Sequence, residues 1–239
     1  MSSSFALVLL LLALGMVYSV RAGKLTMLAA WTGGALGVAI YLGTGFLGLG
    51  LLVLFFGLGT TASAWQVADK RRLGLAEANK GRRTASQVLA NAGVAGLLGL
   101  WAWHYPAHAP LGRLLLAGSL SAATADTLAS ELGNVYGRRY VNILTFRPDQ
   151  RGLDGVISLE GTLLGLAGTA LLAAVYCLVV GWGAGFWVLL VAGTVGNLSD
   201  SLLGATLERR GYLPNDAVNF LNTFIGALTA AGLYQWGWH

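Results

Sequence analysis

Residues 25–68 read LTMLAAWTGGALGVAIYLGTGFLGLGLLVLFFGLGTTASAWQVA, and this run decides the fold class. It lies between Lys24 and Asp69 and contains no charged residue. Because a helix needs about 20 apolar residues to cross a bilayer, the run is long enough for two crossings. We expect the chain to turn back at Gly43-Thr44-Gly45, where glycines interrupt the apolar sequence. The run therefore predicts a helical protein that crosses the membrane more than once.

The composition of the whole chain supports the same class. Of its 239 residues, 56% are hydrophobic and only 10% are charged, whereas a soluble domain carries about 25% charged residues. Such a chain cannot cover a water-facing surface, so its excess apolar area must face lipid. We predict an all-α, polytopic transmembrane helix bundle, formed by residues 1–239 as a single integral membrane domain.

The few charged residues delimit the other spans. No charge occurs between Glu160 and Asp200, which leaves room for two helices around Gly181-Trp182-Gly183. Single spans are expected at about 5–20, 87–103, 111–128 and 217–234, which makes about eight in all. Arg21 and Lys24 follow the first span and no basic residue precedes it, so we do not expect a cleaved signal peptide.

Lysine and arginine residues are segregated to one side of the predicted bundle. Alternate loops lie near residues 21–24, 65–86, 129–158 and 207–216, and they contain all fifteen Lys and Arg residues except Arg113. The positive-inside rule places these loops in the cytoplasm and both termini outside. We expect a location in the plasma or inner membrane if the source is prokaryotic. The net charge of +5 then reflects topology and membrane lipid head groups, and it indicates no nucleic-acid partner.

Two acidic residues, Asp126 and Asp200, lie inside predicted spans. At about 1.5 Å per residue, both stand roughly 20 Å from the outer surface. Because a charge inside a membrane is costly, carboxylates at matching depth require a shared water-filled or cation-filled cavity. Each could instead be a paired structural acid, but the matching depth favours a functional site.

Further polar residues gather at the cytoplasmic end, where carboxylates suit Mg²⁺ and basic side chains suit phosphate. Lys80, Arg82 and Arg83 fit the second role, with topology alone as the alternative. Ala129, Gly133 and Gly137 recur at four-residue spacing, which favours close helix packing over a phosphate-binding surface. The sequence contains no zinc-ligand spacing, Walker loop or HExxH motif.

Five stretches resemble, in order, the transmembrane-protein-19-like family of membrane proteins, which includes the plant phytyl-phosphate kinase. They are QVLAN at 87–91, ADTLASELG at 125–133, SLEGT at 158–162, GNLSDSLLGAT at 196–206 and NDAVNF at 215–220. The resemblance covers nearly all of the chain after the first span. Asp126, Ala129, Gly133 and Gly137 also fit the D-x-x-A-x-x-x-G-x-x-x-G pattern of CTP-dependent phytol and dolichol kinases. Those kinases typically carry a Lys just before an E-G-[ST] segment, and that Lys is absent here.

This resemblance implies a membrane-embedded kinase that transfers the γ-phosphoryl group of a nucleoside triphosphate, CTP or another, to a prenyl monophosphate. Asp126, Glu131 and Asp200 would be the catalytic carboxylates and the ligands of Mg²⁺ or Mn²⁺. The residues expected to bind nucleotide and substrate are Lys80, Arg82, Arg83, Asn91, Ser130, Arg138, Glu160, Asn197, Ser201, Asn215, Asp216 and Asn219. The expected partners are a prenyl-phosphate lipid, the nucleotide and membrane lipids, with the site facing the cytoplasm. The alternatives are a prenyl alcohol kinase, a secondary transporter and a lipid-binding membrane protein.

Overall fold

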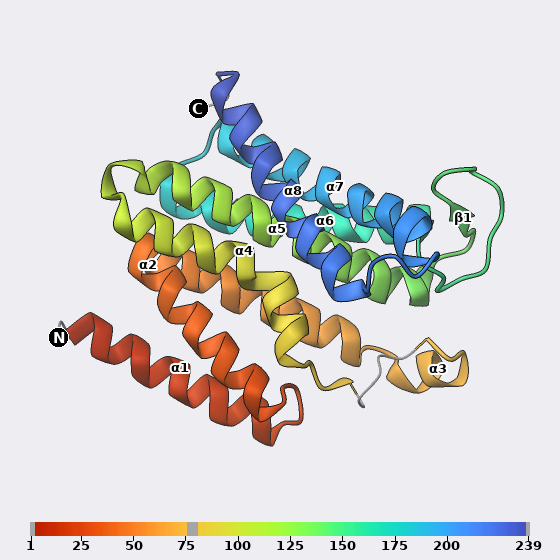
Figure 1. Cartoon of the computed structure of the whole chain (residues 1–239), viewed down its shortest axis with the longest axis horizontal. Coiled ribbons are helices and arrows are strands. Elements are labelled where there is room, and N and C mark those ends of the chain that lie inside the picture. Colours follow the sequence, from red (N-terminus) through yellow and green to blue (C-terminus); the bar gives the residue numbers. More distant parts are fainter. Residues whose placement is uncertain (1–2, 76–80, 238–239) are drawn as a thin grey trace.

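The computed structural model describes residues 3–75 and 81–237, and within them the chain is a bundle of long helices (Figure 1). A two-stranded antiparallel ribbon, β1 with β2, lies between α5 and α6. The elements in chain order are α1 (Ser3–Arg21), α2 (Met27–Ala64), α3 (Val67–Arg72), α4 (Ala85–His104), η2 (Pro106–His108), α5 (Ala109–Tyr136), β1 (Val141–Asn142), β2 (Val156–Ile157), α6 (Leu159–Val180), α7 (Ala184–Leu203), η3 (Gly204–Glu208) and α8 (Asn215–Gln235).

The all-α polytopic prediction is confirmed. Six helical segments are long and apolar enough to cross a membrane by length and composition: α1, α2, α4, α6, α7 continued through η3, and α8. Helix α2 has 38 residues, which is about 57 Å and therefore too long for one crossing of a hydrocarbon core about 30 Å thick. It bends at Gly45 (φ 69°, ψ −154°), within the expected Gly43–Gly45 turn. The total of about eight spans stays a prediction.

The two chain ends lie at the same end of the bundle (Figure 1). The opposite end carries α3, the β ribbon and the connection between α7 and α8. The loops predicted to be cytoplasmic therefore gather at one end of the molecule, as expected if alternate loops lie on the same side of the membrane. The direction in which this end faces stays a prediction.

Helix α5 is the centre of the bundle and packs against α2, α4, α6, α7 and α8. Its neighbours approach closely through glycine: a Cβ atom added at Gly165 of α6 would lie 2.6 Å from the carbonyl oxygen of Ala125. The same holds at Gly161, where an added Cβ would lie 2.7 Å from the carbonyl oxygen of Ala129. Gly133 faces Gly161 in this contact. The small-residue stripe of α5 is thus a helix-packing surface, as its spacing favoured.

The structure corrects three of the predicted loops. The loop predicted at 129–158 begins only at Gly137, because α5 continues through Tyr136 while its stripe packs on α6. The loop predicted at 65–86 contains the short helix α3. The loop predicted at 207–216 is shorter on both sides, since η3 extends to Glu208 and α8 begins at Asn215.

The outward faces of the helices are apolar, as contact with lipid requires. Leu10 and Leu14 of α1 and Leu178 of α6 are among the exposed large side chains. The single cysteine, Cys177, is buried in the apolar core, as its surroundings in the sequence predicted.

Candidate functional site

A polar cavity of about 290 Å³ opens at the end of the bundle that carries the β ribbon. Helices α4, α6 and α8 begin at this cavity, whereas α5 and α7 end there. Ten of the predicted site residues line it: Arg83, Asn91, Asp126, Ser130, Glu131, Asn197, Asp200, Ser201, Asn215 and Asn219. The folded chain therefore brings together residues that the sequence assigned to one site, from four helices (α4, α5, α7 and α8) and from Arg83, just before α4.

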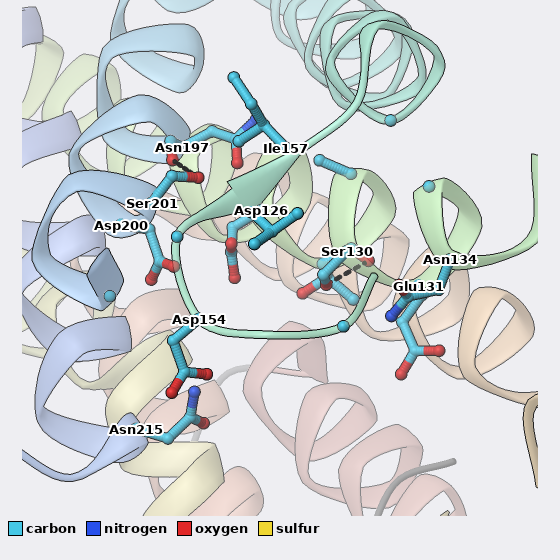
Figure 2. A pocket seen from close by; sticks show the side chains of 18 of the residues that line it. Asp126, Ser130, Glu131, Asn134, Asp154, Ile157, Asn197, Asp200, Ser201 and Asn215 are labelled. Carbon is cyan, nitrogen blue, oxygen red and sulfur yellow. Dashed lines mark hydrogen bonds between the residues drawn. The ribbon is translucent and has the colours of Figure 1, made fainter. Parts of the chain in front are cut away.

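The carboxylates of Asp126 and Asp200 are neighbours in this cavity and point into the same space (Figure 2). The Oδ2 atom of Asp200 is buried and has no hydrogen-bond partner within the described residues. Glu208 adds a further negative charge to the pair, and Asp154 lies close to Glu208. Because like charges repel at short range, this arrangement favours a bound cation.

Glu131, the third predicted metal ligand, is engaged elsewhere. Its Oε2 atom forms an ion pair with the Nζ atom of Lys70, and its Oε1 atom accepts a 3.1 Å hydrogen bond from the Ser63 hydroxyl. Figure 2 shows its carboxylate set apart from those of Asp126 and Asp200. In the described part of the chain, no three acidic, histidine or cysteine side chains are grouped closely enough to hold a metal ion. Of the three predicted metal ligands, Asp126 and Asp200 therefore lie next to each other, and Glu131 is paired with Lys70.

Three helix N-termini, those of α4, α6 and α8, also border the cavity. Backbone N–H groups and the helix dipole make such ends favourable for phosphate. Helix α4 starts with a capping box, in which Thr84 and Gln87 cap each other's backbone. Ser158 caps α6 by accepting from the Gly161 N–H at 3.1 Å. Helix α8 follows Pro214 and has no side-chain cap, and its Asn219 donates to Asn215 at 3.0 Å beside the cavity.

The structure separates the predicted basic residues. Arg83 lines the cavity, with its guanidinium carbon 5.8 Å from the Phe55 ring centroid and its side chain near Gly59 and Thr127. Its backbone bonds to Lys24 and Thr26 fix the start of α4 to the start of α2. Arg82 is exposed and does not line the cavity. Lys80 lies outside the described residues.

Three other predicted residues do not line the cavity: Arg138, Glu160 and Asp216. Glu160 accepts a 3.3 Å hydrogen bond from the Arg138 backbone N–H, which joins the end of α5 to the start of α6. These two residues thus connect helices beside the cavity.

The segment between α5 and α6 covers the cavity with residues 152–158. Tyr140 donates from its hydroxyl to the Gly133 carbonyl at 2.9 Å, and burial raises the pKa of this phenol. Asp149 accepts from Arg209 at 2.8 Å, which ties the segment to the end of η3. Gly155 packs directly on the backbone of Ala205. The cover is therefore built into the fold by specific contacts.

Several residues of the site gave no clear signal in the sequence. Lys70 read as one more basic loop residue, although its side chain is buried. Glu208 sits on a π-helical turn that continues α7, and no periodic pattern predicts such a turn. Tyr140 and Leu75 reach the cavity from connections whose path depends on tertiary contacts.

Fold and cavity together define a class: a polytopic α-helical membrane protein with a polar, acid-lined cavity at one end of its bundle. The family model "Integral membrane protein DUF92" matches residues 9–227, and the chain belongs to this family. The family resemblance indicated by the five sequence motifs is thereby confirmed.

Relatives align over most of the chain. Protein VTE6, chloroplastic, of Arabidopsis thaliana is 33% identical over 216 residues, which cover 87% of this chain and 63% of VTE6. An uncharacterized membrane protein of Synechocystis sp. is 34% identical over 213 residues, covering 85% of this chain and 79% of its own length. One from Methanocaldococcus jannaschii is 34% identical over 190 residues, covering 80% and 77%. The chain thus spans less than two thirds of VTE6. No solved structure matches it.

Proposed function

We propose that the protein is a membrane-embedded isoprenyl-phosphate kinase. It transfers the γ-phosphoryl group of a nucleoside triphosphate, CTP or another, to a prenyl monophosphate such as phytyl or geranylgeranyl phosphate, and the product is the diphosphate. One observation carries the proposal: a single polar cavity combines neighbouring carboxylates with helix N-termini and an arginine. The family resemblance given by the sequence motifs points to the same chemistry.

The residues of the cavity fit Mg²⁺ or Mn²⁺. Asp126 and Asp200 supply two adjacent carboxylates, and the buried Oδ2 of Asp200 lacks a hydrogen-bond partner in the described part of the chain. Mg²⁺ at nucleotide sites is commonly held by one or two carboxylates together with phosphate oxygens and water. A pair of acids therefore suffices. The bound ion would neutralise charge on the phosphates.

The remaining residues bind and orient the two anions. Arg83 and the N-termini of α4, α6 and α8 would bind the phosphates, with Asn91 and Asn219 as hydrogen-bond donors. An acceptor phosphate is already ionised, so no group has to remove its proton. What remains for the protein is in-line positioning and charge neutralisation. The prenyl tail would lie between helices, outside this polar cavity.

The test is a product assay. Purified protein in anionic lipid vesicles is incubated with phytyl or geranylgeranyl phosphate, or with the free alcohols, and with each nucleoside triphosphate and Mg²⁺. Mass spectrometry reads the lipid products. We expect prenyl diphosphate, and we expect none from the matched Asp126→Asn/Asp200→Asn variant. Absence of diphosphate with every acceptor and nucleotide would refute the proposal.

A prenyl alcohol kinase is the second candidate, because the cavity holds carboxylates beyond the central pair. Asp154 and Glu208 line it, and either could accept the proton of an attacking hydroxyl. The same assay distinguishes the two, since an alcohol kinase converts the free alcohol to the monophosphate and leaves added monophosphate unchanged.

A further inference from the structure

The Glu131 carboxylate of α5 faces the end of α2 and the short helix α3. It accepts from the Ser63 hydroxyl through Oε1 and pairs with Lys70 through Oε2, and it is only 13% exposed. Both oxygens are thus engaged by α2 and α3. This differs from Asp200, whose Oδ2 has no hydrogen-bond partner within the described residues.

Lys70 is committed to this contact. Its side chain is 1% exposed, although it belongs to the short polar helix α3. Besides Glu131, its Nζ atom donates to the carbonyl oxygens of Ala62 at 2.8 Å and Ser63 at 3.4 Å. An ammonium group has three donors, so all of them are used. Lys70 therefore caps the last turn of α2 and joins α3 to α5.

A second basic side chain, that of Arg83, lies between α2 and α5 about one helical turn away. Arg83 lies near Gly59 of α2 and Thr127 of α5, and Ser63 and Glu131 follow these residues by four positions each. If Lys70 were absent, Glu131 would be an uncompensated anion one turn from the side chain proposed to bind phosphate. An anionic substrate would then be repelled, since unit charges interact strongly at such distances in a protein interior.

We propose that Lys70 is a positioning residue of this site. Together with Ser63 it holds Glu131 against α2 and compensates its charge. Glu131 therefore adds no net negative charge beside the phosphate-binding residues and is not a metal ligand. This inference rests on the proposed function, because it assigns the metal to Asp126 and Asp200 and the phosphates to the side of Arg83.

The test compares Lys70→Met, Glu131→Gln, the double variant Lys70→Met/Glu131→Gln and Asp126→Asn, each in detergent. Two binding constants are measured: Mn²⁺ with CTP by electron paramagnetic resonance, and geranylgeranyl phosphate by calorimetry. We expect Glu131→Gln to bind Mn²⁺ within about 2-fold of the wild type, and Asp126→Asn to bind it at least 10-fold more weakly. We expect Lys70→Met to weaken geranylgeranyl phosphate about 10-fold and the double variant to restore it within about 3-fold.

This restoration separates charge compensation from a merely structural role, because a structural loss would persist in the double variant. If Lys70→Met does not fold, the Mn²⁺ binding of Glu131→Gln and of the double variant still tests whether Glu131 is a metal ligand. Loss of Mn²⁺ binding in Glu131→Gln equal to that in Asp126→Asn would overturn the inference and leave the proposed kinase standing. If the binding constants follow the expected pattern but the product assay finds no phosphorylated prenyl phosphate, the proposed kinase activity is refuted and the role of Lys70 stands.

Discussion

Asp126 of α5 and Asp200 of α7 face each other in one cavity, although the helix α6 separates their two helices along the chain (Figure 2). Both helices run toward the same end of the bundle, so residues at similar depth meet. Paired carboxylates this close destabilise the empty site by mutual repulsion and bind a divalent cation favourably. The pair therefore lowers the stability of the empty protein and favours binding of a divalent cation, which marks it as a functional feature.

Replacing either carboxylate of this pair should abolish activity without harming the fold. We expect Asp126→Asn and Asp200→Asn each to lower prenyl-phosphate kinase turnover by at least about 100-fold, because charge neutralisation of the transferred phosphoryl group is lost. The unfolding temperature without metal should stay equal or rise, since a repulsion is removed. Turnover is measured by the mass-spectrometric assay, and unfolding by circular dichroism in detergent.

Asp69→Asn is the matched control, because Asp69 is an exposed acid that pairs only loosely with Arg72 at 3.5 Å. It should change neither quantity appreciably. Variants of Asp126 or Asp200 that misfold, while their residual folded fraction keeps wild-type specific activity, would show that these acids are structural.

Arg83 and Arg82 should behave differently although they are adjacent. Arg83 lines the cavity and Arg82 does not. A charge-assisted hydrogen bond contributes about 1.5–3 kcal/mol, so Arg83→Ala should raise the KM for the prenyl phosphate at least about 10-fold. Arg82→Ala should change it less than about 2-fold. Steady-state kinetics at saturating nucleotide measures both, and a larger effect of Arg82→Ala would place the acceptor outside this cavity.

Most of the fold followed from the sequence because it depends on one-dimensional signals. The uncharged run at 25–68, the glycine pairs 43/45 and 181/183, and the apolar lengths of the other spans predicted α1, α2, α4, α6, α7 and α8 within a few residues. The end of α5 was placed too early, at residue 128, since polarity alone was taken to end the span. The helix continues beyond that residue because Ala129 and Gly133 pack on α6.

The candidate site was only partly accessible to such reasoning. Asp126 and Asp200 stood out because a charge inside a span is rare. The partner of Glu131 did not, since the contact with Lys70 joins residues far apart in the sequence. Arg82 and Arg83 are adjacent residues of the same type, and contacts distant in the sequence distinguish them: the backbone of Arg83 bonds to the start of α2, and its side chain packs on Phe55. Tertiary contacts, which composition and spacing do not encode, decide these points.

Close helix contact at Gly165 should make even a methyl group destabilising. A Cβ atom there would lie 2.6 Å from the Ala125 carbonyl oxygen, so α5 and α6 would have to separate. Overpacking of this kind costs about 1–3 kcal/mol of unfolding free energy. Gly50→Ala is the control, because no atom lies within 4 Å of an added Cβ, and it should stabilise α2 by about 0.5–1 kcal/mol. Denaturation in mixed micelles measures both changes.

The cover over the cavity should loosen in acid through Asp149. The Gln150 backbone N–H, then Arg209 and Asn142, donate to this carboxylate and hold its pKa below the ordinary value. A lowered pKa means that the stabilisation is complete above the ordinary carboxyl range and is lost as the pH falls through the folded value. Hydrogen exchange of residues 140–157, corrected for intrinsic rates, should therefore speed up in acid. Asp149→Asn should remove this pH dependence, and an unchanged dependence would assign it to another group.

The orientation of the bundle is the last prediction, and the placement of the site on the cytoplasmic side depends on it. All fifteen Lys and Arg residues except Arg113 lie in the four segments predicted to be cytoplasmic. Segments rich in Lys and Arg stay in the cytoplasm. In a Cys177→Ala background, Ala68→Cys and Ala107→Cys place one thiol near each end, since both positions are exposed and lie on α3 and η2. In intact cells, a membrane-impermeant maleimide should label Ala107→Cys and spare Ala68→Cys, and both should react after permeabilisation. The opposite pattern would place the cavity outside, where nucleoside triphosphates are scarce, and would count against a kinase.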